Sequence, residues 1–237
     1  MDSNLYPDVA AAGSLAVALE QLAAGLDIRL VTVPGRPPSV HSAGIVASVP
    51  DRGPLFVHTG SQRRSFGVSG WSQGVQLITG DTADLGDVVK AGVAWGEGRS
   101  LRELHESLPF LGSSELAQAH ERGPAAAVAV QWGLMREQAA GAPDFPEFGL
   151  LVDAAHAEPR LRELYPFSSH WTLGFRVATV YPFCAVVAIA PSHNERPYRV
   201  EESPRGDVIG ESATAEGAVA LAVAYLAAVA ETAESDA

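Results

Sequence analysis

The sequence predicts an α+β fold in which two antiparallel sheets are flanked by helices. Segments in which apolar and polar residues alternate follow one another between helical segments, whereas a parallel sheet would need strands and helices in strict alternation. Short stretches rich in proline and glycine separate these segments, as they do in β-hairpins. Apolar residues make up 47% of the 237 residues, so the chain can bury a substantial core.

The chain divides into two halves, which we place at residues 1–112 and 113–237. Each half contains strands followed by a capped helix, and the two helices begin with related sequences, GDTADLGDVVKA from Gly80 and GESATAEGAVAL from Gly210. Two similar helix-sheet-helix halves are one interpretation of this likeness. The motif LREL also occurs twice, but at different points relative to the predicted strands, so a duplication stays open.

The first half begins with a predicted helix over residues 14–24, where leucines recur at helical spacing. Period-two alternation then predicts a meander of strands at residues 28–33, 44–49, 54–59, 64–69 and 75–78. A helix follows, with Asp81 or Thr82 as its N-cap. A further helix over residues 100–108 begins with the capping-box sequence SLRE.

In the second half, prolines mark the starts of helices, because the first helical turn does not need the N–H that proline lacks. The helices are predicted to begin at Pro124, Pro146 and Pro159. Strands are predicted at residues 171–178, 183–190, 198–202 and 208–210. The chain closes on a helix over residues 214–230, whose apolar residues recur every three or four positions.

The charge and the cysteine content exclude several classes of function. A net charge of −12 argues against nucleic acid or an anionic membrane as a partner, because clustered Lys and Arg bind those surfaces. Cys184 is the single cysteine, so the chain forms no internal disulfide and a cytoplasmic location is expected. No basic residue precedes Arg29, as a signal peptide would require, and the apolar runs are short for a membrane span.

The seven histidines lack the H-x-H or H-x-x-x-H spacing of a metal site. We therefore expect no metal and no other tightly bound cofactor. His105, His120 and His193 lie among polar residues and are expected to be solvated.

Residues 70–74, GWSQG, match the G-x-S-x-G pattern of a nucleophile elbow, with Ser72 as the candidate nucleophile. An elbow needs a strand before the serine and a helix after it. Residues 75–78 continue as a strand instead, so the segment is predicted to be a hairpin turn. A serine hydrolase is accordingly the third candidate function.

Unusual polar and aromatic side chains gather at residues 161–182, where a short helix leads into an aromatic corner and a strand. If the strand is unbroken from His170, this residue shares a face with Arg176. The pair would supply a group that titrates near neutral pH and a fixed cation, as cofactor-free acid–base catalysis requires. We name both as catalytic candidates and their neighbours as substrate-binding candidates: Tyr165, Phe167, Ser168, Ser169, Trp171 and Tyr181.

A structural interpretation of the same stretch stays open. The two serines would then cap and turn the chain, while His170 would bond a backbone carbonyl. Arg176 would face the solvent instead of clamping a carboxylate or phosphate.

The stretch resembles an actinobacterial family that has only a domain-of-unknown-function label and is described as natural-product biosynthesis proteins. The resemblance rests on the segments YPFSSH at residues 165–170, TLGF at 172–175 and Tyr181-Pro182. Further agreement lies at residues 198–200, 210–211 and 214–216, and in the first half at Trp71, residues 74–75 and 80–82, and Trp95. Arg176 and the apolar residues 183–186 depart from the expected pattern.

The resemblance implies a setting in secondary metabolism and leaves the role open. The leading hypothesis is an accessory or tailoring protein that acts on or holds a small-molecule or carrier-bound pathway intermediate. The alternative is a non-catalytic binding module, such as a chaperone-like, carrier-binding or immunity protein. Whether the chain forms a homodimer is left open.

Overall fold

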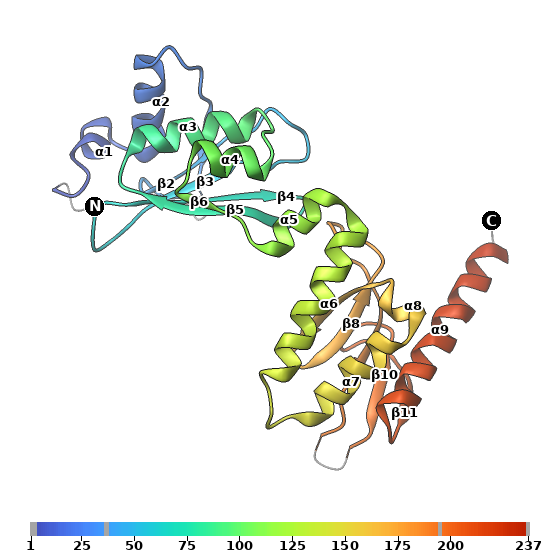
Figure 1. Cartoon of the computed structure of the whole chain (residues 1–237). Helices are drawn as coiled ribbons and strands as arrows, with labels where there is room; N and C mark the ends of the chain where they lie inside the picture. Colours follow the sequence, from blue (N-terminus) through green and yellow to red (C-terminus); the bar gives the residue numbers. More distant parts are fainter. Residues whose placement is uncertain (1–3, 36–37, 194–195, 236–237) are drawn as a thin grey trace. The chain divides into compact units, whose positions relative to one another are not determined.

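The computed structural model describes residues 4–35, 38–193 and 196–235, without the side chains of residues 233–235. The chain divides into two compact units, residues 1–121 and 122–237 (Figure 1). The sequence placed this division earlier, between residues 112 and 113. The intervening segment belongs to the first unit because Ala117 is buried in its core and Glu121 accepts a hydrogen bond from the Leu101 amide at 2.9 Å.

The helices of the first unit begin at capping side chains, except α1, which begins at Pro7 without one. They are α1 (Pro7–Ala12), α2 (Leu15–Gly25), α3 (Leu85–Gly96), α4 (Leu101–Ser107) and α5 (Glu115–Arg122). Ser14 caps α2, and the capping box of Ser100 and Glu103 is confirmed at α4. The cap of α3 is Asp84, whose carboxylate accepts from the Gly86 amide at 2.7 Å, so the prediction of Asp81 or Thr82 was wrong. The short helices α1 and α5 were not predicted.

Within the described residues, the first unit has a six-stranded antiparallel sheet in which each strand pairs with the next along the chain. Its strands are β1 (Thr32–Pro34), β2 (Ser42–Ile45), β3 (Leu55–Thr59), β4 (Phe66–Ser72), β5 (Val75–Thr82) and β6 (Leu111–Gly112). The predicted meander is therefore confirmed, except that the two-residue β6 was missed. Trp95 of α3 is fully buried in the core of this unit.

The helices of the second unit are α6 (Pro124–Ala140), α7 (Pro146–Ala157), α8 (Pro159–Arg162) and α9 (Ala215–Ser235). The three predicted starts at proline are confirmed, each proline lying in the first turn. The strands are β7 (Tyr165–Ser169), β8 (Thr172–Arg176), β9 (Ala185–Ala190), β10 (Tyr198–Glu201) and β11 (Val208–Ser212). They form an antiparallel sheet in the order β11-β10-β9-β8-β7. The predicted α+β class is thus confirmed.

Helices α6, α7 and α9 cover one face of this second sheet. Trp132 of α6, Phe148 of α7 and Ala218 of α9 share a buried cluster with Phe175 and Val187 of the strands. Residues 215–232 of α9 are long and apolar enough to cross a membrane by length and composition alone, with 22% of that window buried. Buried helices of soluble proteins pass the same test, and α9 contributes Ala218 to this core.

The structure differs from the predicted strand at residues 171–178. Tyr165–Ser169 forms a strand of its own, β7, and pairs antiparallel with β8 from Tyr165↔Arg176 to Ser169↔Thr172. His170 and Trp171 are the two turn residues between these strands. The expectation of an unbroken strand from His170, on which the shared face with Arg176 depended, was therefore wrong. Residues 165–169 alternate as a strand does. Pro166 argued against a strand in the sequence, because proline has no N–H to donate to a neighbouring strand.

Candidate functional site

The β7–β8 turn has an unusual backbone. Both turn residues lie in the left-handed region, His170 at φ 49° and Trp171 at φ 68°. Two-residue hairpins of this kind favour Asn-Gly, because a side chain with a Cβ raises the energy of the left-handed conformation by about 1–2 kcal/mol per residue. A bulky aromatic residue held at such a position is typical of a functional constraint.

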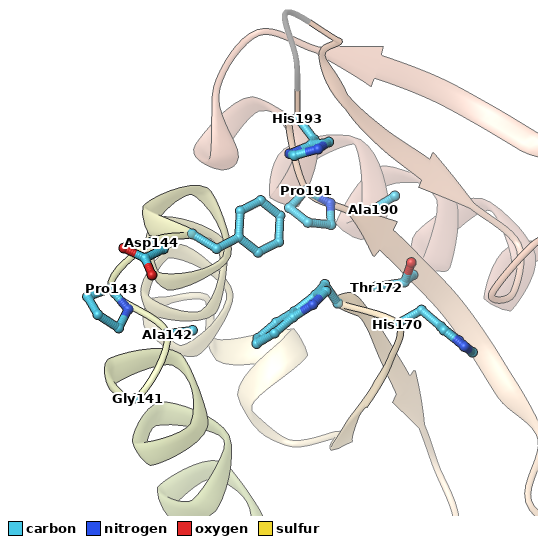
Figure 2. Close-up of a pocket in the computed structure, with 11 residues that line it drawn as sticks. Gly141, Ala142, Pro143, Asp144, His170, Thr172, Ala190, Pro191 and His193 are labelled. Carbon is cyan, nitrogen blue, oxygen red and sulfur yellow. The ribbon is translucent and has the colours of Figure 1, made fainter.

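This turn forms one wall of a cleft with a volume of about 690 Å³. The cleft is lined by the α6–α7 connection at residues 141–145, by residues 170–172, by Ala190 at the end of β9, and by Pro191 and His193 after it (Figure 2). Three segments far apart in the sequence thus meet at one end of the hairpin. Most of the lining side chains are apolar.

Aromatic rings pack edge to face along the cleft. Phe145 meets Trp171 with ring centroids 5.6 Å apart and His193 at 5.7 Å, both with an interplanar angle of 85°. Phe148, fully buried, packs edge to face against Trp171 with ring centroids 5.3 Å apart. Trp171 nevertheless stays 41% exposed, so one part of its indole is held by the core and another is open to a ligand.

The position of Phe145 follows from the sequence around it. The residue precedes Pro146, which disfavours the helical conformation at Phe145, and it takes φ −134° and ψ 66° at the start of α7. Its ring stacks on that of Phe148, one turn into the helix, at 6.5 Å. The position before proline and the contact with Phe148 thus place the ring at the start of α7.

The histidines at the cleft are not arranged for acid–base catalysis. The imidazole of His170 points away from Pro143 and Asp144 on the opposite wall (Figure 2). Its Nδ1 lies 3.3 Å from the Ser169 hydroxyl, in an exposed position. His193, which we expected to be solvated, is exposed but packs its ring against Phe145.

The predicted site residues separate into two groups. His170 and Trp171 lie at the cleft, with Ser169 beside His170. Phe167, Arg176 and Tyr181 belong to a different cluster at the other end of the hairpin, where Arg176 pairs with Tyr165. His170 and Arg176 are therefore at opposite ends of β8 and cannot act on one atom.

Two further predicted residues attach the hairpin to α6. The Ser168 hydroxyl donates to the Gln138 side chain at 3.1 Å, and the Tyr165 hydroxyl donates to that of Gln131 at 3.2 Å. Tyr165 is 8% exposed, and its burial raises the pKa of its phenol. Both side chains hold β7 in place and do not line the cleft.

Phe145 and His193 were missed as binding residues by the sequence analysis. The aromatic residue before Pro146 was a usable signal, since a residue before proline is predicted to be non-helical at the start of a helix. Nothing in the local sequence at His193 predicts its contact with a ring 48 positions earlier in the chain.

The remaining candidate chemistries are nucleophilic catalysis by Ser72, which lies in the first unit, and metal binding. The Ser72 hydroxyl donates to the Asp51 carbonyl at 2.6 Å, and β4 passes into β5 through a turn at Gln73 and Gly74. The predicted hairpin is confirmed, and Ser72 has no strand-elbow-helix around it. In the part of the chain that the structure describes, no three His, Cys, Asp or Glu side chains gather as metal ligands.

Comparison with known proteins places a family match on the second unit. No curated protein and no solved structure shows significant similarity to the chain. The residues of the first half that carried the resemblance, such as Trp71, lie outside the matched region. Residues 126–236, which include the cleft and the whole β7–β8 hairpin, match a family described as "Family of unknown function (DUF6193)".

Proposed function

We propose that the second unit binds a small molecule with a planar, largely apolar group in the cleft beside Trp171. The observation that carries this proposal is the half-exposed indole, held at φ 68° and packed edge to face against Phe145. A volume of about 690 Å³ lies in the range of roughly 300–1,000 Å³ that small-molecule sites occupy. A planar ligand can stack on the open face of the indole.

The geometry of the cleft supports binding of the molecule better than catalysis of a reaction on it. Catalysis by proton transfer needs a base within hydrogen-bond reach of the substrate, with a second group to orient that base. His170 has Ser169 as its side-chain neighbour and directs its imidazole away from the opposite wall (Figure 2). The arrangement therefore favours an accessory protein that binds an intermediate.

For the biological setting we propose natural-product biosynthesis, with a free or carrier-bound pathway intermediate as the ligand. The support for this setting is the resemblance of the hairpin sequence, YPFSSH and TLGF, which forms one wall of the cleft. The rival proposal, a non-catalytic module that docks a protein, would use a flat apolar surface. The cleft favours the small molecule.

Binding can be tested with 2-naphthol as a planar probe and cyclohexanol as a non-planar control. The indole N–H signals of the 4 tryptophans are followed by NMR during titration. We expect 2-naphthol to shift the Trp171 signal saturably and cyclohexanol to leave it in place. Trp171→Leu lacks the reporting indole, so the affinities of the variants and the parent are compared by isothermal titration calorimetry. This substitution should weaken binding about tenfold through the lost ring contact.

Trp71→Leu is the matched control, because Trp71 is also 41% exposed but lies in the first unit. Its affinity for 2-naphthol should equal that of the parent protein. Equal affinity of the Trp171→Leu variant, or no saturable shift of the Trp171 signal, would contradict the proposal.

A further inference from the structure

Arg176 lies at the far end of β8 from the cleft, between two phenyl rings. Its guanidinium carbon is 3.9 Å from the ring centroid of Phe167 and 4.6 Å from that of Phe183. Phe167 is on β7, and Phe183 is on the connection between β8 and β9. Cation–π contacts of this kind hold the plane of the guanidinium while leaving its edge free.

In the part of the chain that the structure describes, the donors on that edge have no acceptor. Within the described residues, no hydrogen bond or ion pair involves the Arg176 guanidinium. The group is half-buried, and this burial lowers its pKa below the usual value for arginine. An arginine that loses water in this way is ordinarily paired, because its five N–H donors need acceptors.

Two other half-buried arginines of the chain show the ordinary arrangement. Arg52 also lies over a ring, that of Trp95 at 4.3 Å, but it donates to the carbonyls of Trp95 and Arg99 at 3.1 and 2.6 Å. Arg64 lies over Phe66 at 5.0 Å and donates to both carboxylate oxygens of Asp8 at 2.8 Å. Both are satisfied within the protein, so the contrast identifies Arg176 as the exception.

The apolar side chains around Arg176 are exposed, so a ligand in solution can reach the guanidinium. Phe183 is 38% exposed, and Tyr181, which meets it edge-on at 6.1 Å, is 69% exposed. Val177 on the same connection is 71% exposed. A cation is thus presented at the surface in an apolar frame, where a charge-assisted hydrogen bond is stronger than in open water.

We propose that Arg176, held between Phe167 and Phe183, binds a carboxylate group of a ligand. The planar carboxylate would accept two parallel hydrogen bonds from the edge of the guanidinium, and the exposed rings would contact the group that bears it. This site is independent of the binding proposed for the cleft, because Thr172 at the cleft and Arg176 are four strand positions apart, about 13 Å.

Benzoate is the probe, with benzamide as its neutral isostere, and the reporter is the Nε–H signal of Arg176 in an NMR titration of the full chain. We expect benzoate to shift this signal saturably and benzamide to leave it unchanged. Arg176→Lys lacks this reporter, so the benzoate affinities of the variants and the parent are compared by isothermal titration calorimetry. The lysine keeps the charge but loses the planar fork, so benzoate should bind about tenfold more weakly. Arg160→Lys, at an exposed arginine of α8, is the matched control and should bind as the parent does.

A second pair of probes distinguishes a small carboxylate from the end of a protein chain. N-acetyl-Ala-Ala-Phe with a free carboxylate is compared with the same peptide amidated. A shift of the Arg176 signal by benzoate supports a small-molecule ligand, and a shift by the free peptide alone supports a chain terminus. If neither acid shifts the signal, or if Arg176→Lys binds benzoate as tightly as the parent, the proposal is overturned. The titration of the unaltered protein gives this answer even if the variant fails to fold.

Discussion

Trp171 in the β7–β8 turn meets Phe145 at the start of α7 edge to face, with ring centroids 5.6 Å apart. The two residues lie in segments that are far apart in the sequence. The backbone conformation of each is constrained within its own segment. Trp171 is held in the left-handed region, and Phe145 is kept out of the helical conformation by the proline after it. The cleft therefore exists because two local constraints meet across the end of the sheet.

His170→Asn should keep binding intact and raise stability slightly. Asparagine adopts the left-handed conformation at lower energy than histidine, and among the described residues the exposed imidazole has one hydrogen-bond contact, with Ser169 Oγ. We expect the free energy of unfolding to rise by up to about 1 kcal/mol, measured by urea denaturation. A loss of 2-naphthol affinity would instead make His170 a binding residue.

The two units should respond separately to core mutations. Trp132 is 2% exposed and its indole N–H donates to the Arg162 carbonyl at 3.0 Å, so Trp132→Ala should destabilise the second unit by about 3–5 kcal/mol. Trp95→Ala is the counterpart in the first unit, where Trp95 is fully buried and donates to the Gly53 carbonyl at 2.9 Å. Hydrogen exchange should show lost protection only in the mutated unit. Equal loss in both units would show that their cores unfold together.

Ser72→Ala should have little effect on stability. The hydroxyl makes one hydrogen bond, to the exposed Asp51 carbonyl, so about 1 kcal/mol or less is lost. The turn geometry depends on Gly74, at φ 83°, and not on the serine. A fluorophosphonate probe should leave the parent protein unlabelled. Stoichiometric labelling that disappears in the variant would restore the hydrolase interpretation.

The ion pair between Asp8 and Arg64 should contribute a pH-dependent part of the first unit's stability. The Arg64 side chain, through its hydrogen bonds, lowers the pKa of the Asp8 carboxyl below its usual value. A carboxyl whose folded pKa is depressed stabilises the fold above its unfolded pKa, and this contribution is lost as the pH falls through the folded pKa. The difference in unfolding free energy between parent and Asp8→Asn should therefore be constant near neutral pH and shrink below about pH 4. A difference that grows on acidification would refute this linkage.

The sequence predicted local features well and the site poorly, for a physical reason. Caps, proline starts and period-two strands are set by neighbours in the chain, so Ser100, Pro124 and the β4–β5 turn were predicted correctly. The β7 strand was misread because Pro166 and two serines resemble a turn, whereas pairing with β8 and attachment to α6 determine its conformation. Contacts such as Phe145 with His193 depend on tertiary packing, which no local pattern records.

Gly174→Ala should weaken carboxylate binding at Arg176 without altering the cleft. Gly174 pairs with Phe167 across the hairpin, and a Cβ added to it would overlap the Phe167 ring, which would have to move away from the Arg176 guanidinium. We expect benzoate to bind several-fold more weakly by the Arg176 Nε–H titration, because one side of the cation–π frame is lost, about 1 kcal/mol. The 2-naphthol affinity should equal that of the parent.

Gly149→Ala is the control for this substitution. Gly149 lies within α7 in the same unit, and a Cβ there has no heavy atom within 4 Å, so alanine should be neutral or stabilising by up to about 1 kcal/mol. Benzoate should bind this variant as it binds the parent. If Gly174→Ala binds benzoate with parental affinity while its Phe167 ring signals have shifted, the ring is not needed to hold Arg176, and the carboxylate site would rest on Phe183 alone.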